Sequence, residues 1–174
     1  MENNNNSKMV TGMFRDRESA ERAYNSLEEK GYTKDEINVI MSDDTRKKYF
    51  NEDDDTELGS KAWEGAGAGS AIGGTVGAVA GIIAAIGTNL VLPGLGLVIA
   101  GPIAAGLAGA GAGGITGGLI GALIGSGIPE EHAAMYEKGV KDGHIVMGVK
   151  PRSDEEADYI SNDWRDNKGE SIYR

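Results

Sequence analysis

The sequence of 174 residues contains no cysteine, two histidines and few aromatic residues. Without cysteine, the chain can form no disulfide bond, thiolate metal site or cysteine nucleophile. The histidines, His132 and His144, lack the spacing of metal ligands, and no serine, histidine and aspartate arrangement indicates a catalytic triad. We therefore expect a protein that is not an enzyme and that holds no metal or cofactor.

Positive charge is also scarce, because 17 Lys and Arg stand against 27 Asp and Glu, for a formal net charge of -10. Nucleic acid is bound by clustered cations, so this balance argues against it. No motif indicates a small-molecule substrate. The polar residues 1–7 lack the basic and apolar regions of a secretory signal. We expect these residues to be disordered and the protein to be cytoplasmic, or at the cytoplasmic face of a membrane.

Charge is absent altogether from residues 65–129, which hold 21 of the 28 glycines. Two sets of glycines recur at every fourth residue, a spacing that places each set on one face of a helix. Such faces let two helix backbones approach closely. We interpret residues 65–128 as a glycine-zipper helical hairpin. Its helix-packing residues are Gly65, Gly69, Gly73, Gly77, Gly81, Gly109, Gly113, Gly117, Gly121 and Gly125.

A turn between the two helical arms is expected at Pro93 and Gly94, which interrupt the helical pattern. Either arm would be long enough to cross a hydrocarbon core of about 30 Å. The apolar residues 90–92 at the tip fit a hairpin that enters a bilayer without emerging, or one buried in a homo-oligomer. Trp63 is a candidate interfacial anchor, with packing onto the flanking domain as the alternative. A flexible linker would be richer in serine and would not keep the register twice.

The first charged flank, residues 8–42, has the pattern of a β-α-β unit. Two β-rich runs enclose a helix that Asp16 can cap and Gly31 can end. A helical stripe of apolar residues marks the face that we expect to be buried. It consists of Ala20, Ala23, Tyr24 and Leu27.

The second flank, residues 129–174, repeats this pattern after an additional helix that begins at Pro129. A strand follows at 144–149, then a helix with a capping box formed by Ser153 and Glu156, and finally a short strand. The stripes expected to be buried are Ala133, Tyr136 and Val140, then Ala157, Ile160 and Trp164.

Neither flank alone has enough strands for a stable core. Joined, they predict an α+β protein with the ferredoxin-like split β-α-β pattern, and the hairpin inserted between the second and third strands. Two independent mini-domains are the alternative. Residues 43–64 form an acidic linker, whose run at 51–55 lacks the glycine and distal glutamate of an EF-hand loop.

Short motifs in both flanks are typical of one family of stress proteins. They are residues 10–14, 20–24, Leu27, 31–32, 37–41, 127–131, Ala134, 136–137, Val140, Gly143 and 145–149. With these motifs, the flanks resemble the general stress protein 17M-like domain, also called the heat-induced stress protein domain. The glycine-rich insertion is similar to those of low-temperature-induced proteins. The resemblance implies stress association and no catalytic reaction.

Two functional hypotheses remain open from the sequence. In the first, a non-enzymatic stress-associated protein inserts its hairpin into the membrane, or associates with the membrane, and self-associates through the zipper. In the second, a soluble protein assembles into a ring or filament with the hairpins packed in a shared apolar centre. The acidic flanks weaken the first hypothesis, because anionic lipid attracts basic segments.

Overall fold

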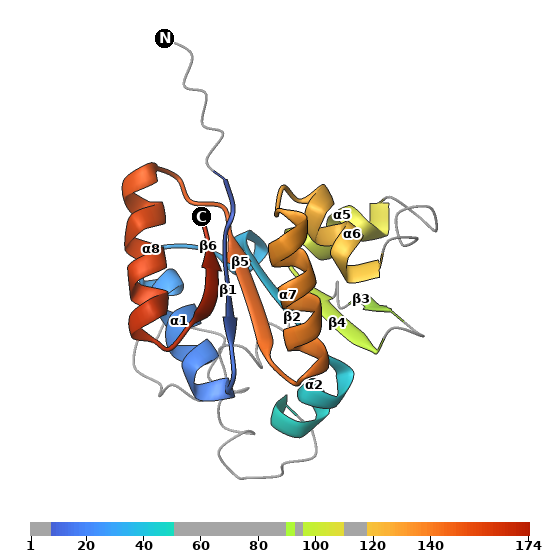
Figure 1. Cartoon of the computed structure of the whole chain (residues 1–174). Helices are drawn as coiled ribbons and strands as arrows, with labels where there is room; N and C mark the ends of the chain where they lie inside the picture. Colours follow the sequence, from blue (N-terminus) through green and yellow to red (C-terminus); the bar gives the residue numbers. More distant parts are fainter. Residues whose placement is uncertain (1–7, 51–89, 93–95, 110–117) are drawn as a thin grey trace, which may run out of the picture.

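The β-rich runs of both flanks pair into one antiparallel sheet in the computed structural model, which describes residues 8–50, 90–92, 96–109 and 118–174. The strands lie in the order β3-β4-β2-β5-β1-β6, with every neighbouring pair antiparallel (Figure 1). Their bounds are β1 Val10–Phe14, β2 Ile37–Ser42, β3 Leu90–Leu92, β4 Leu97–Ala100, β5 Ile145–Val149 and β6 Glu170–Tyr173.

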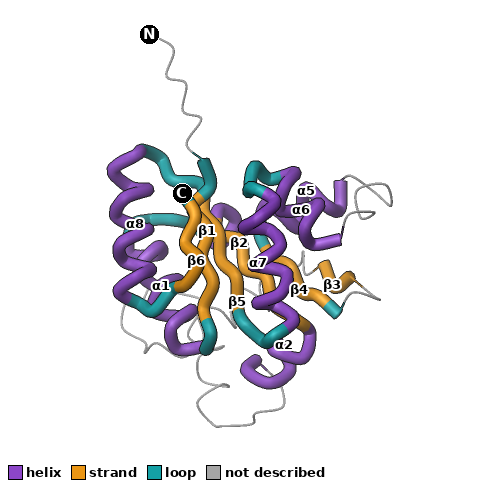
Figure 2. Tube along the Cα trace, viewed as in Figure 1, coloured by secondary structure: helices purple, strands orange, loops and turns teal. Residues whose placement is uncertain are grey.

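Helices cover both faces of this sheet (Figure 2). Helices α1 (Arg17–Glu29) and α8 (Asp154–Asp166) pack on one face, and α5 (Pro102–Gly109), α6 (Gly118–Gly125) and α7 (Glu130–Lys141) pack on the other. Helix α2 (Asp43–Phe50) continues from β2, and a short 3-10 helix, Lys34–Glu36, precedes β2. The α+β class predicted from the sequence is confirmed.

The first helix begins and ends as the sequence predicts. The Asp16 carboxylate accepts a hydrogen bond from the Ser19 backbone N–H at 2.8 Å, which caps α1. At the other end Gly31 has a positive φ of 82°. Its N–H bonds to the Glu28 carbonyl while the Tyr32 N–H bonds to the Leu27 carbonyl. This pairing is a Schellman motif, and it directs Tyr32 back onto the core.

Each face of the sheet has its own apolar core. Phe14, Tyr24 and Trp164 are fully buried between the sheet and the α1–α8 layer, where Phe14 and Trp164 meet edge to face at 5.6 Å between ring centroids. On the other face, Tyr136 of α7 and Leu123 of α6 are equally buried. All the residues of the predicted helical stripes are buried, so the periodicity located these faces correctly.

Both flanks contribute to the same sheet, because β5 lies between β1 and β2. Val10 to Phe14 pair with Val149 to Ile145, and Ile37 to Ile40 pair with Val149 to Val146. The alternative of two independent mini-domains is therefore wrong. Strand β5 of the second flank pairs with β1 and β2 of the first flank, and these pairings are long-range contacts that neither flank could make alone.

The predicted helical hairpin at 65–128 is wrong at residues 90–92 and 97–100, whereas residues 102–109 and 118–125 are helical as predicted. Residues 97–100 form strand β4 beside β2, and residues 90–92, expected at the apolar tip between the two helical arms, form β3. The described residues of the second arm form α5 and α6. A short apolar run that is buried on both sides has no periodicity that separates strand from helix. Gly101, with a φ of 94°, then turns the chain into α5.

Two smaller boundaries also differ from the sequence prediction. The first eight residues of the predicted linker at 43–64 form α2, whose Thr45 is buried. Helix α7 begins at Glu130, so that Pro129 is its N-cap rather than its first helical residue. The Ser153 hydroxyl accepts from the Glu156 N–H as expected, but the Glu156 carboxylate contacts Arg152 and Tyr32 instead of completing the box.

Candidate functional site

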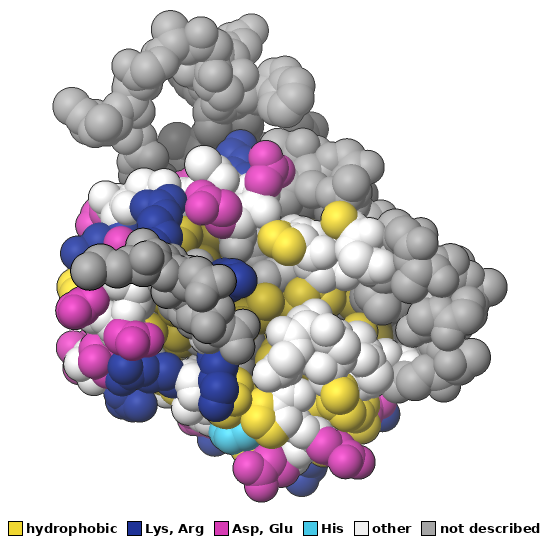
Figure 3. All heavy atoms as spheres, turned by 90° about the horizontal axis from the view of Figure 1, so that it is seen from above, with side chains coloured by type: hydrophobic (Ala, Val, Ile, Leu, Met, Phe, Trp, Pro, Cys, Tyr) yellow, Lys and Arg dark blue, Asp and Glu magenta, His cyan; other side chains and the backbone are white. Residues whose placement is uncertain are grey.

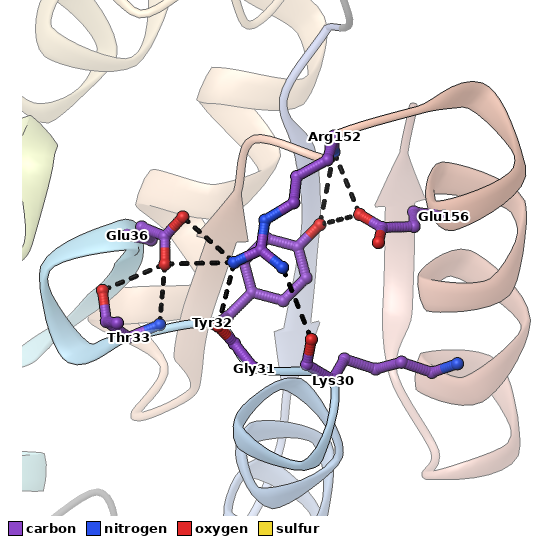
Figure 4. A network of polar contacts seen from close by, with 7 residues as sticks. All are labelled: Lys30, Gly31, Tyr32, Thr33, Glu36, Arg152 and Glu156. Carbon is purple, nitrogen blue, oxygen red and sulfur yellow. Dashed lines mark hydrogen bonds and ion pairs between the residues drawn. The ribbon is translucent and has the colours of Figure 1, made fainter.

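A clasp of polar side chains joins the two flanks at the surface (Figure 4). Arg152 follows β5, and its guanidinium lies 4.3 Å from the ring centroid of Tyr32, the residue after the turn that ends α1. Its Nη2 donates to the Gly31 carbonyl at 2.9 Å and lies 3.3 Å from the Glu36 carboxylate. Planar stacking together with several donors suits arginine better than lysine at this position.

The same clasp holds a carboxylate against a phenol. The Tyr32 hydroxyl donates to Glu156 Oε2 at 2.5 Å, and the Arg152 backbone N–H donates to the same oxygen at 3.1 Å. The Tyr32 hydrogen bond, helped by the Arg152 N–H, lowers the pKa of Glu156. Burial, reinforced by the Glu156 contact, raises the pKa of Tyr32 to about 12. The clasp is therefore charged at neutral pH and fixes the α1–β2 turn against the start of α8.

A second junction ties the inserted segment to the split domain. Asn38 is buried in β2, where its Oδ1 accepts from the Ile103 N–H at 2.8 Å and its Nδ2 donates to the Gly148 carbonyl at 3.1 Å. The Ile103 N–H belongs to the first turn of α5, whose amides have no partner within the helix. Asn38 thus caps α5 from a neighbouring strand, and Pro102 at the helix start needs no donor.

Close backbone approach at Gly101 makes this junction possible. A Cβ atom at Gly101 would collide with the Ile37 carbonyl oxygen, and the positive φ would strain any other residue. The sequence alone did not single out Asn38 or Gly101 as residues of this junction. A single asparagine within the apolar run Ile37 to Met41 was the available signal, because a buried amide needs partners.

The outward side of α5 and α6 forms a surface without charge, which we call the α5–α6 surface. It is made of small and aliphatic residues on a chain that is otherwise strongly charged. In Figure 3, charged side chains gather over the α1–α8 side of the molecule, whereas uncharged atoms occupy the region of α5 and α6. The exposed members of the α5–α6 surface are Pro102, Ala105, Gly106, Ile124 and Gly125.

Two of the predicted zipper glycines lie on α6 and can be tested against this geometry. A Cβ atom added at Gly121 or Gly125 would meet no heavy atom within 4 Å. These positions are therefore not sites of close packing within the described parts of the chain. Ile124, between them, is 43% exposed. An open backbone beside an exposed isoleucine is a surface that a second helix could approach closely.

The remaining predicted site residues divide into two groups. Gly109 is the last residue of α5. The others lie outside the described residues, so their predicted roles stay predictions. They are Trp63, Gly65, Gly69, Gly73, Gly77, Gly81, Pro93, Gly94, Gly113 and Gly117.

Charged side chains also meet around a cavity of about 550 Å³ at the end of the sheet where β1 and β2 finish. Two of its cations face carboxylates outside it: Arg15 pairs with Glu170 at 2.7 Å, and Lys141 pairs with Glu137 at 2.8 Å. Asp44 and Asp142 add negative charge to the lining. The lining also holds the hydroxyl groups of Ser42 and Thr45 and the imidazole of His144.

Two further findings concern the described residues only. They contain no group of three or more His, Asp or Glu side chains placed to hold a metal ion. None of the described helices combines the length and the apolar composition that crossing a bilayer requires.

Comparison with known proteins gives no match to this chain. No family model, curated protein or solved structure is similar enough to be assigned to it. A function is therefore proposed from the geometry of the clasp, the Asn38 junction and the α5–α6 surface.

Proposed function

We propose that the chain is a non-enzymatic, stress-associated protein that self-associates through the uncharged surface of its glycine-rich insertion. The α5–α6 surface is the observation that carries this proposal. It combines an exposed isoleucine with two helical glycines whose Cβ positions are open. Close helix packing at such positions gains dispersion contacts along the backbone.

The inner side of α5 and α6 supports a role for their outer side in self-association. Leu119 and Leu123 of α6 are buried in the core that α5, α6 and α7 share with this face of the sheet, and Asn38 fixes the start of α5. Among the described residues of the insertion, α5 and α6 therefore have an anchored apolar side and an exposed, uncharged free side. A partner can use the free side without removing the helices from the domain.

A lipid bilayer is the second candidate partner. The observation that favours it is the absence of charge from residues 65–129. A segment that faced only water would not need to lack charged residues over so long a stretch. In this version the insertion associates with the membrane, and self-association follows there. The formal charge of -10 opposes binding to anionic lipid, so self-association is the first of the two proposals.

The fold name and the stress association belong to the same proposal. The order β6-β1-β5-β2 is the order expected when two β-α-β units interleave, and it supports a ferredoxin-like assignment with the insertion between β2 and β5. The stress association is supported by the resemblance of the flanks to the general stress protein 17M-like domain.

The proposal is tested by adding bulk to the α5–α6 surface. The double substitution Gly121→Leu with Gly125→Leu fills the open backbone positions, so we expect the oligomer mass from sedimentation velocity to fall. The matched control is Ala134→Leu, which adds an apolar side chain at an exposed position of α7.

An unchanged mass distribution in the double variant would contradict self-association through this surface. Flotation with liposomes separates the two candidate partners. Wild-type protein that stays monomeric in buffer but floats with neutral phosphatidylcholine vesicles would overturn self-association and favour the bilayer.

A further inference from the structure

Two helix ends of opposite polarity meet at the cavity where β2 finishes and β5 begins. The first turn of α2 lines it on one side, and the end of α7 with the turn into β5 lines it on the other (Figure 1). The two sides are close, because a Cβ atom at Gly143 would lie 3.7 Å from Thr45 Oγ1. The N-terminal end of a helix favours a negative group and the C-terminal end a positive one. The cavity is therefore polarised from α2 to α7.

A hydroxyl donor on the α2 side has no acceptor among the described residues. Thr45 is 4% exposed, and Ser42 Oγ accepts a hydrogen bond from its backbone N–H at 3.0 Å. The two hydroxyl oxygens lie 2.8 Å apart, so that one hydroxyl donates to the other. Each hydroxyl has a single hydrogen to donate. One O–H group of this pair is therefore left to donate to an oxygen atom bound in the cavity.

Lys48 adds a positive charge to the same side. Its ammonium group lies 4.7 Å from the ring centroid of Tyr49 and forms no ion pair with a carboxylate of the described residues. Arg15 and Lys141, by contrast, already pair with carboxylates outside the cavity. Lys48 and the Ser42–Thr45 hydroxyl pair are thus donors that a ligand carboxylate can use.

The α7 side supplies a carboxylate. Asp142 is the exposed C-cap residue of α7, and its side chain makes no hydrogen bond or ion pair within the described part of the chain. Asp44, in the first turn of α2, adds a second carboxylate to the lining. An ammonium group forms charge-assisted hydrogen bonds with carboxylates and suits the C-terminal end of a helix. A ligand with charge of one sign only would leave part of this lining without a partner.

We propose that this cavity binds a small zwitterion that carries an ammonium group and a carboxylate, as amino acids do. The ligand carboxylate lies toward Lys48 and the Ser42–Thr45 hydroxyl pair, and the ammonium group lies toward Asp142. The cavity volume of about 550 Å³ is within the range of small-molecule sites. None of the lining residues belongs to the α5–α6 surface, so this inference does not depend on the proposed self-association.

Nuclear magnetic resonance on the full chain tests the proposal with glycine, β-alanine and γ-aminobutyrate as probes. We expect at least one of them, at millimolar concentration, to shift the resonances of Thr45, Gly143 and His144. Butyrate and n-butylamine carry only one of the two charges, so each should bind more weakly. Asp142→Asn and Lys48→Gln should each weaken binding of the amino acid about fivefold, the size that one partly exposed charge pair provides.

Asp166→Asn and Lys150→Gln are the matched controls, because both residues are exposed and lie outside the cavity lining. Both controls should bind the amino acid like the wild type. The proposal is overturned if none of the three amino acids shifts the cavity resonances, or if butyrate or n-butylamine binds as tightly as they do. Equal binding by all four variants also overturns it. If a variant does not fold, the comparison of probes on the unmodified protein still decides.

Discussion

Asn38 is the residue on which the attachment of the insertion depends most directly. Replacing it by alanine leaves the Ile103 N–H and the Gly148 carbonyl without their side-chain partner. An unsatisfied buried group costs roughly 1–3 kcal/mol. We therefore expect Asn38→Ala to lower the free energy of unfolding by about that amount, as measured by urea denaturation.

Asn162→Ala provides the comparison for this substitution, because Asn162 is exposed on α8 and contacts Arg165 at the surface. Surface changes of this kind usually stay within about 0.5 kcal/mol. An equal effect of the two substitutions would show that the Asn38 junction does not hold α5.

Glu156 gives the clasp a dependence on pH. The contacts with Tyr32 and Arg152 lower its folded-state pKa. The stabilisation is therefore fully present above the unfolded carboxyl pKa, about 4.3, and is lost as the pH falls through the lower folded value. We expect Glu156→Gln to be less stable than the wild type at pH 7, with the gap closing in acid.

The measurement is thermal unfolding of both proteins from pH 7 down to pH 3. Glu131→Gln is the matched control, because Glu131 is an exposed carboxylate in the first turn of α7, away from the clasp. A gap between wild type and Glu156→Gln that stays constant across this range would show that the clasp carries no charge-dependent stability.

Residues with local roles could be identified from the sequence, whereas residues with distant partners could not. Asp16 and Gly31 act within a few positions of themselves, so their types reveal their roles. Asn38 and Arg152 contact residues far along the chain. Such pairings follow from the order of strands in the sheet, which local patterns do not encode.

At the scale of elements, the glycines of α6 and α7 have opposite roles. Gly121 has open space where a Cβ would be, whereas a Cβ at Gly139 of α7 would collide with the Met13 sulfur. Glycine in a helix costs about 1 kcal/mol relative to alanine. We expect Gly121→Ala to raise the free energy of unfolding by about 1 kcal/mol and Gly139→Ala to lower it.

Both variants are measured by urea denaturation at concentrations below those at which the protein associates. A loss of stability in Gly121→Ala would mean that α6 packs closely at this position within one chain. That result would remove Gly121 from the α5–α6 surface.

The elements of the two flanks were predictable because strands and amphipathic helices have distinct periods. The elements of the insertion were harder to predict from the sequence. Residues 97–100 are apolar at every position, so strand and helix give the same pattern there. The four-residue spacing of Gly117, Gly121 and Gly125 suggested one long helix, although α6 begins only at Gly118. Regular glycine spacing indicates a helix face but does not fix where the helix begins.

At the scale of the whole molecule, the insertion completes the domain that it interrupts. Helices α5 and α6 join α7 over the sheet face that α1 and α8 leave uncovered (Figure 1). This placement explains how such an apolar segment can belong to a strongly acidic chain. In the described part of the insertion, the inner sides of α5 and α6 are buried in the core over this face of the sheet, and their outer sides are exposed and uncharged.

The central claim is that this outer side joins copies of the chain. Sedimentation velocity on the unmodified protein, without detergent and over a wide concentration range, tests it most directly. The account predicts species at multiples of the 18.2 kDa chain mass, with their proportion increasing with concentration. A single 18.2 kDa species at every concentration would contradict it.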